Sequence, residues 1–205
     1  MTRHILLAAA LVVVACATKP TATADPDAGY PGTLVPADAI AHDFQWQQRV
    51  TAQWHGEQRG FEAVLSKSDE ELLLVGLGPM KTPGFFVRLR DGEVSFENRT
   101  PETLPFEPRY IMLDVQRVYY PWIPGDPPTT GERRHAVEGE TVYERWEAGR
   151  LRERRFARED GRPAGEITVR YEGWEEGLDA PRRATLTNGW LGYSLVIDTV
   201  VQERL

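Results

Sequence analysis

The stretch Phe44-Gln45-Trp46-Gln47-Gln48-Arg49-Val50-Thr51-Ala52-Gln53-Trp54 decides the fold, because large apolar and polar side chains alternate along it. A period of two places Phe44, Trp46, Val50 and Trp54 on one side of an extended chain. This pattern is typical of a β-strand with one dry face and one wet face. We therefore expect the core to be built on a sheet.

Shorter stretches of the same kind follow on both sides of mid-chain, separated by turn signals. Asp91-Gly92 and Asn188-Gly189 are the strongest of these signals, because both dipeptides favour tight hairpins. With 44–54, the expected strands number about ten. The others cover residues 61–65, 72–77, 85–90, 93–97, 141–147, 151–157, 166–174, 182–187 and 190–201.

One segment changes to a helical period. Pro108 suits a first helical turn, where a missing N–H costs nothing. Ile111, Val115, Val118 and Trp122 follow at helical spacing, and Asp114 and Arg117 are expected opposite them as an i,i+3 pair. The fold class is therefore mainly β (α+β): a curved antiparallel sheet or half-open barrel of about ten strands with a helical lid.

The N-terminus has the pattern of an export signal, with a basic start and a short apolar run over residues 1–15. Val13-Val14-Ala15-Cys16 resembles the bacterial lipobox, which implies lipidation of Cys16; a plain signal peptide or a buried apolar strand are the alternatives. Residues 16–31 are expected to hold the lipidated cysteine and a flexible tether, and 32–205 a single domain. Ala17 implies delivery to the outer membrane by the enterobacterial sorting rule that this pattern resembles, and we expect the protein to face the periplasm.

Composition excludes some partners and chemistries. The net charge of −7 argues against nucleic acid, and membrane attachment is expected only through acylated Cys16, the sole cysteine. His42, His55 and His135 are isolated, and neither a Gly-x-Ser-x-Gly nor a zinc motif occurs, so we expect no catalytic residue, metal or cofactor. The arginine-rich segment 144–160 is either a salt-bridged wet face, which its alternating signs favour, or an anion-binding hairpin.

Aromatic residues are the better functional signal. A curved sheet lined by large apolar side chains and covered by a helix can form a lipophilic pocket, although such side chains often just fill a core. The candidate ligand-binding residues are Trp46, Trp54, Phe61, Phe85, Met112 and Trp122.

Three segments carry a family resemblance: 44–54, 72–78 and above all Leu104-Pro105-Phe106 through Trp122. Together they are similar to an uncharacterised family of bacterial lipoproteins, classed as a domain of unknown function and often encoded beside aryl-polyene synthesis genes. The order of elements more distantly resembles LolA and LolB. That resemblance implies a half-open barrel with a helical lid over an apolar cavity, and proteins that carry or receive lipoproteins.

The expected function is that of an outer-membrane lipoprotein, not an enzyme, that binds or transfers a hydrophobic ligand: an acyl chain, a lipoprotein lipid or a polyene. Release would follow movement of the helix at 108–120, and envelope export machinery would be a partner. The alternatives are a structural or assembly lipoprotein that docks another envelope protein, with an exposed apolar patch in place of a cavity, and a lipid-modifying enzyme.

Overall fold

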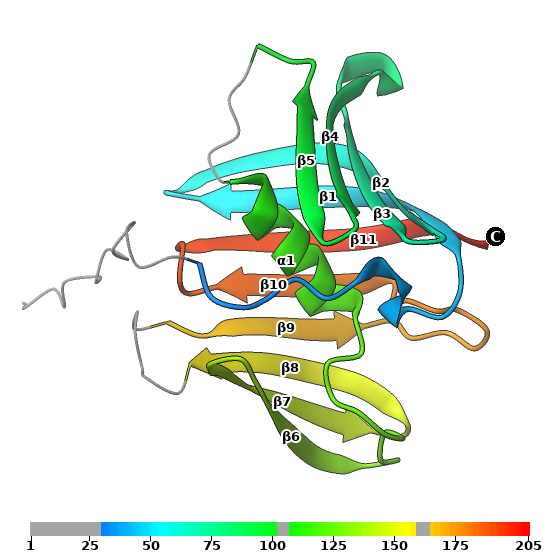
Figure 1. Cartoon of the computed structure of the whole chain (residues 1–205), viewed down its shortest axis with the longest axis vertical. Helices are drawn as coiled ribbons and strands as arrows, with labels where there is room; N and C mark the ends of the chain where they lie inside the picture. Colours follow the sequence, from blue (N-terminus) through cyan, green and yellow to red (C-terminus); the bar gives the residue numbers. More distant parts are fainter. Residues whose placement is uncertain (1–29, 102–106, 159–164) are drawn as a thin grey trace, which may run out of the picture.

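The computed structural model describes residues 30–101, 107–158 and 165–205, which form a curved sheet around one helix (Figure 1). The predicted signal peptide, Cys16 and most of the predicted tether lie outside these residues. The single α-helix of the described part, α1, spans Pro108–Tyr119, and two short 3-10 turns, η2 and η3, span Ala37–Ala39 and Pro79–Lys81. The strands are β1 (Phe44–Trp54), β2 (Glu57–Ser68), β3 (Glu71–Leu77), β4 (Pro83–Arg90), β5 (Glu93–Asn98), β6 (Gly131–Val137), β7 (Glu140–Glu147), β8 (Arg150–Arg158), β9 (Ile167–Glu172), β10 (Arg183–Asn188) and β11 (Tyr193–Arg204).

All strand pairs are antiparallel, and the order is β5-β4-β3-β2-β1-β11-β10-β9-β8-β7-β6. The first and last strands thus lie side by side in mid-sheet (Figure 1). Within the described residues β5 and β6 are the two edges and do not pair with each other, so the sheet is unclosed. The predicted fold class, a curved antiparallel sheet with one helix, is confirmed.

Alternation along each strand sets which side chains face the helix. Val87 and Leu89 of β4 are fully buried, whereas Arg88 and Arg90 between and beyond them point to the opposite side. We call the side of the sheet that carries Val87 and Leu89 the inner face. The core lies between this face and α1, as the alternation in 44–54 predicted.

Two details of the sheet differ from expectation. β6 was not predicted, because its sequence Gly131-Glu132-Arg133-Arg134-His135-Ala136-Val137 is charged and lacks an apolar face; as an edge strand it has less need of one. The Asn188-Gly189 pair is not a two-residue turn: Asn188 pairs with Tyr193 across a four-residue connection. Gly189 is needed instead because a Cβ there would lie 2.7 Å from the carbonyl oxygen of Glu166.

The helix starts at Pro108 as predicted, but its buried side is not the predicted one. Asp114 and Arg117 do form an i,i+3 ion pair, with 3.1 Å between Oδ1 and Nη1. Both are buried, at 3% and 1% exposure, whereas the apolar Ile111 and Val115 are only half-buried. The helix therefore turns a polar cluster inward over part of its length.

The chain before β1 runs along the helix (Figure 1). We call residues 30–40 the N-terminal segment. Gln116 of α1 bonds both the N–H and the carbonyl of Val35, at 2.9 and 2.6 Å, and Tyr120 donates to the carbonyl of Ala37 at 3.2 Å. Tyr30, at the end of the predicted tether, is only 5% exposed and belongs to this packed segment.

Candidate functional site

The predicted site residues divide into three groups. Trp46 and Met112 are core residues, 3% and 0% exposed. The ring of Trp46 stacks on Phe44 with centroids 3.9 Å apart and meets Tyr119 edge-on at 5.0 Å. These two side chains support the inner face and have almost no surface left to offer a ligand.

Trp122 lies just beyond the C-terminal end of α1. Its ring packs edge-on against Phe156 of β8 at 5.3 Å, and its Nε1 donates to the carbonyl of Gln116 at 2.9 Å. Because β8 and β2 lie on opposite sides of β1 in the sheet, the structure does not bring Trp122 together with Phe61 and Phe85.

Trp54, Phe61 and Phe85 do share one surface. By the strand register, Phe61 is opposite Val50 on β1, Phe85 is opposite Gly76 on β3, and Trp54 is opposite Tyr193 on β11. Phe96 of β5, which the sequence analysis did not select, joins them because it pairs with Val87.

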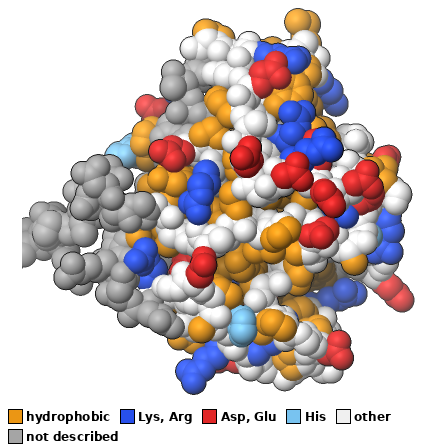
Figure 2. Space-filling model, viewed as in Figure 1, with side chains coloured by type: hydrophobic (Ala, Val, Ile, Leu, Met, Phe, Trp, Pro, Cys, Tyr) orange, Lys and Arg blue, Asp and Glu red, His pale blue; other side chains and the backbone are white. Residues whose placement is uncertain are grey.

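We call Trp54, Phe61, Phe85 and Phe96 the inner-face strip. Phe61 and Phe85 meet edge-on with centroids 6.1 Å apart and are half-buried, while Trp54 and Phe96 are 39% and 37% exposed. The helix packs against β4 and β5, so its half-buried Ile111 and Val115 belong to the same region. Figure 2 shows apolar side chains reaching the surface on this side of the molecule, between charged ones.

The position of Phe85 depends on a glycine beside it. A Cβ built on Gly76 would lie 2.0–2.6 Å from three atoms of the Phe85 ring. The ring therefore lies over Gly76 of β3, where only glycine leaves room for it. The chain bends between β3 and β4 only after Leu77, so Gly76 is a strand residue with a packing role.

A buried polar cluster fixes the other part of the helix. Asp114 accepts hydrogen bonds from the hydroxyls of Tyr30 and Tyr193, and from Asn188 Nδ2 at 3.2 Å. Arg117 binds Asp114, the carbonyl of Pro31 at 2.6 Å and Glu140 Oε2 at 3.2 Å. The guanidinium also lies over the ring of Tyr30, at 4.8 Å.

A second ion pair holds the end of the helix. Arg154 donates to Glu144 Oε1 through Nε and Nη2, at 2.9 and 2.7 Å, and to the carbonyl of Arg117 at 2.9 Å. Tyr171 donates to the carbonyl of Val118 at 2.9 Å. The last carbonyls of α1 are thus bound by side chains of β8 and β9.

Burial and these contacts shift the pKa values of two groups, Glu144 and Tyr171. Burial alone would raise the pKa of Glu144, but Arg154, with hydrogen bonds from Arg133 and Trp146, outweighs it and lowers the pKa below its usual range. Burial raises the pKa of Tyr171 to about 12. Both groups therefore hold one protonation state at neutral pH and act as fixed structural contacts.

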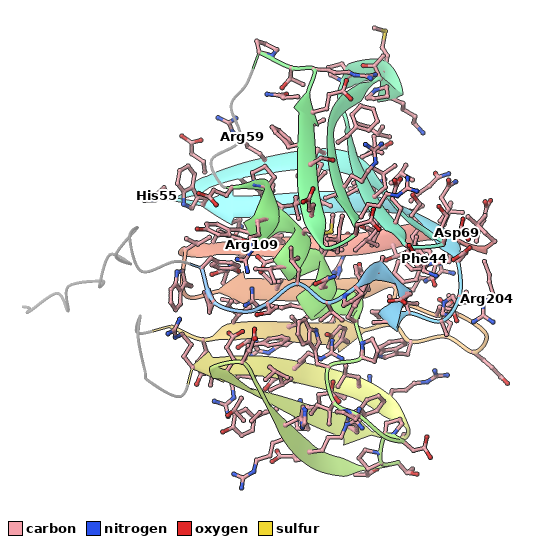
Figure 3. The ribbon with its side chains drawn as sticks, viewed as in Figure 1. Phe44, His55, Arg59, Asp69, Arg109 and Arg204 are labelled. Carbon is pink, nitrogen blue, oxygen red and sulfur yellow. The ribbon has the colours of Figure 1, made fainter. Side chains whose placement is uncertain are left out.

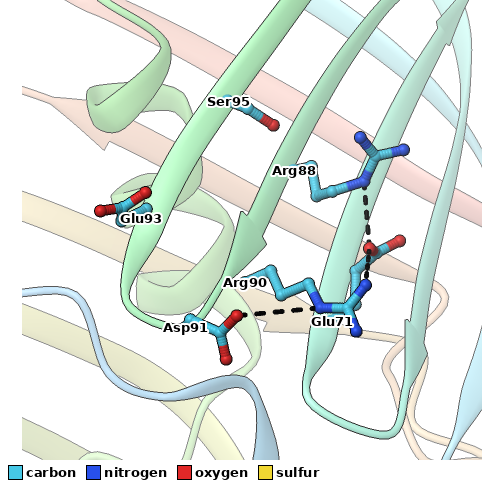
Figure 4. Close-up of a pocket in the computed structure, with 6 residues that line it drawn as sticks. All are labelled: Glu71, Arg88, Arg90, Asp91, Glu93 and Ser95. Atoms are coloured by element: carbon cyan, nitrogen blue, oxygen red, sulfur yellow. Dashed lines mark ion pairs between the residues drawn. The ribbon is translucent and has the colours of Figure 1, made fainter.

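An open surface pocket lies elsewhere, on the outer side of β3, β4 and β5 (Figure 4). It has a volume of about 500 Å³ and is lined by Glu71, Arg88, Arg90, Asp91, Glu93 and Ser95. Glu71 forms ion pairs with Arg88 at 3.1 Å and Arg90 at 3.9 Å, so the charges that line the pocket largely neutralise one another.

The arginine-rich segment is mostly paired, as its alternating signs favoured. Besides Arg154 with Glu144, Arg155 lies 2.7 Å from Glu166 and Arg145 contacts Glu147. Within residues 30–101, 107–158 and 165–205, no three His, Cys, Asp or Glu side chains are grouped so that they could hold a metal ion. The helix of the described part is too short and too polar to cross a membrane.

Comparison with known proteins identifies a family. Residues 45–201 match a family described as "Protein of unknown function (DUF3261)". No curated protein matches the chain.

Several solved structures are similar in outline. A LolA superfamily protein from Nitrosomonas europaea has 13% identity and a TM-score of 0.46, covering 82% of this chain and 89% of that one. A domain provisionally described as an outer membrane lipoprotein-sorting protein, from Vibrio parahaemolyticus, has 12% identity and a TM-score of 0.45, covering 82% and 87%. A DUF1329 family protein from Desulfovibrio piger has 11% identity and a TM-score of 0.35, covering 82% and 88%. At these low scores the matches do not determine a function.

Proposed function

The chain belongs to the DUF3261 family, and we propose that it is an outer-membrane lipoprotein that binds a long apolar molecule along the inner-face strip. The ligand class is an acyl chain, a lipoprotein lipid or a polyene. The observation that carries the proposal is the half-exposure of four aromatic side chains that the strand register aligns on one face. Contact between such an apolar surface and water is unfavourable. Covering it with an apolar ligand would stabilise the complex by about 25 cal/mol per Å² of apolar area removed from water.

The strip is preorganised for binding, because packing and the strands restrain its side chains. Phe85 is held over Gly76 and against Phe61, and the strip lies on strands, not on loops. A ligand therefore does not have to order these side chains, which reduces the entropic cost of binding.

The helix acts as a fixed wall. Moving all of α1 would separate Arg154 from the carbonyl of Arg117 and Arg117 from Glu140, both of which are buried. Leaving one partner of a buried ion pair alone costs about 3–5 kcal/mol. In place of the swing of the whole helix expected from the sequence, we propose that ligands enter beside its first turn, near Ile111.

The location of the protein is part of the proposal. Lipidation of Cys16 would anchor it, and Ala17 favours the outer membrane, with the domain on the periplasmic side. Because the site is apolar and Glu144 and Tyr171 serve as structural contacts, we propose binding without catalysis.

A second candidate function has an observation in its favour. The polar cluster and Phe156 fill the space between α1 and β8–β10. The inner-face strip, on other strands, is therefore a surface patch. Such a patch also suits docking of another envelope protein, such as export machinery.

Ligand titration separates the two functions. The domain without its signal and tether should increase the fluorescence of cis-parinaric acid, a polyene fatty acid, and native mass spectrometry of the protein purified from membranes should detect a co-purifying lipid. A protein that carries no lipid and leaves the probe fluorescence unchanged would rule out apolar-ligand binding. Crosslinking through Phe96 to one envelope protein would then favour docking.

A further inference from the structure

The described chain begins at one particular end of the molecule. The ring of Tyr30 packs on Tyr110 in the first turn of α1 at 4.6 Å, and edge-on against Trp190 in the β10–β11 connection at 6.3 Å. The next residue, Pro31, is held by a hydrogen bond from Arg117 to its carbonyl oxygen. Residues 1–29, which include Cys16, therefore join the domain beside the start of α1 and the β10–β11 connection.

The inner-face strip reaches the same end. Trp54 pairs with Tyr193 across β1 and β11, and Tyr193 pairs with Asn188, whose side chain donates to the hydroxyl of Tyr30. Figure 3 shows His55, Arg59 and Arg109 on this side of the molecule, whereas Phe44, Asp69 and Arg204 lie on the opposite side.

This end carries side chains that suit a membrane interface. Trp54 is 39% exposed, and Tyr110 and Leu191 are half-buried. Tryptophan and tyrosine are the residues that favour the headgroup region of a bilayer. Arg59 lies 3.5 Å from Glu57, so the charges here are mixed and do not drive binding to anionic lipid by themselves.

We propose that this end, formed by the β1–β2 turn, the β10–β11 connection and the first turn of α1, rests on the bilayer in which Cys16 is anchored. The proposal rests on the proposed function, because it requires an acylated Cys16. Only 14 residue steps separate Cys16 from Tyr30, a reach of at most about 50 Å. This short reach and the exposed aromatic side chains beside Tyr30 favour the lipid surface itself as the partner, and an apolar ligand could pass between the bilayer and the strip without crossing open water.

Two matched turns at the ends of β2 provide the test. His55 and Asp69 are both exposed first residues of tight turns, with φ of 50° and 48°, and lie at opposite ends of the molecule (Figure 3). In the full-length lipoprotein, His55→Cys and Asp69→Cys would each carry the single reactive thiol, since Cys16 is the only native cysteine and acylation blocks it. Each variant is labelled with an NBD fluorophore and reconstituted into vesicles of phosphatidylethanolamine and phosphatidylglycerol.

The expected result is a blue-shifted NBD emission at position 55 that brominated lipids quench several-fold more than at position 69. A label at Met80, which is 93% exposed in the β3–β4 connection, tests whether that connection contacts the bilayer instead. Greater quenching at 80 or 69 than at 55, or equal quenching at all three, would overturn the proposal. Should His55→Cys fail to fold by circular dichroism, Glu57→Cys takes its place.

The two proposals can fail separately. Intact mass of the purified protein reports acylation, and cis-parinaric acid binding reports the strip. An acylated protein that binds the probe but leaves position 55 in water overturns only the orientation. An unacylated protein removes the anchor, and with it the proposed function as a lipoprotein.

Discussion

The ring of Phe85 lies over the backbone of Gly76, so closely that a Cβ on the glycine would come within 2.0 Å of the ring. The absence of a side chain at 76 thus leaves room for an aromatic ring on the inner face. We expect Gly76→Ala to destabilise the domain by about 1–3 kcal/mol, because the ring must move and the packing around it must shift. Urea unfolding measures this cost.

A double-mutant cycle identifies the cause. In a Phe85→Ala background the ring is gone, so Gly76→Ala should be neutral or slightly stabilising, as alanine is less costly than glycine inside a strand. Equal costs of Gly76→Ala in both backgrounds would show that Phe85 is not what requires the glycine.

The ion pair of Glu144 with Arg154 predicts a loss of stability in acid. Because the folded pKa of Glu144 is lowered, its charge stabilises the fold above about pH 4.5, and this contribution is lost as the pH falls through the lowered pKa. Glu144→Gln should lose about 3–5 kcal/mol at pH 7 and show a weaker fall in stability below pH 4.5. The exposed Glu57→Gln is the control, expected within about 0.5 kcal/mol of wild type at neutral pH. If the stability of Glu144→Gln fell below pH 4.5 as steeply as that of the wild type, the assignment to Glu144 would be contradicted.

The two ends of α1 should differ in hydrogen exchange. Side chains bind the carbonyls of Gln116, Arg117 and Val118, whereas Glu107, just before the other end of the helix, is exposed. We expect amides of the last turn to exchange about 10- to 100-fold more slowly than those of Tyr110 and Ile111, measured by NMR or mass spectrometry. Uniform exchange along the helix would instead support a lid that opens as a unit.

The proposed lipidation of Cys16 makes a simple prediction about location. Cys16→Ser should abolish labelling with palmitate and move the protein from the membrane fraction to the soluble fraction, because the acyl chains would supply the anchor. Ala17→Ser, which keeps the cysteine, is the control and should remain in the membrane fraction. Retention of the Cys16→Ser protein in membranes would mean that another part of the chain provides attachment.

Sequence reasoning succeeded where a residue's neighbours along the chain determine its environment. The alternation in 44–54 gives β1 with its bounds, Asp91-Gly92 gives a tight turn with positive φ at both residues, and Pro108 gives the start of α1. Of the candidate site residues, Trp54, Phe61 and Phe85 share the inner-face strip because strand parity alone places them on one face.

Other features depend on contacts distant in sequence. The buried Arg117 is bound through Nη1 by Asp114 and through Nη2 by Glu140 and the carbonyl of Pro31, and helical spacing cannot reveal the last two partners. Trp122 has helical spacing yet packs on β8, beyond the end of the helix. Phe96 could have been found from the Asp91-Gly92 hairpin, since it alternates with Val94 and faces Val87.

Binding of cis-parinaric acid to two neighbouring variants of β4 tests the central claim most directly. Phe85 and Phe86 are adjacent and both half-buried, but Phe85 belongs to the inner-face strip, whereas Phe86 lies on the opposite side, beneath Arg99 at 4.5 Å. Phe85→Ala should weaken binding about five- to thirtyfold, the equivalent of ~1–2 kcal/mol of lost apolar contact, while Phe86→Ala leaves the affinity within about twofold of wild type. Equal effects of the two substitutions, or none, would contradict a ligand site on the inner face.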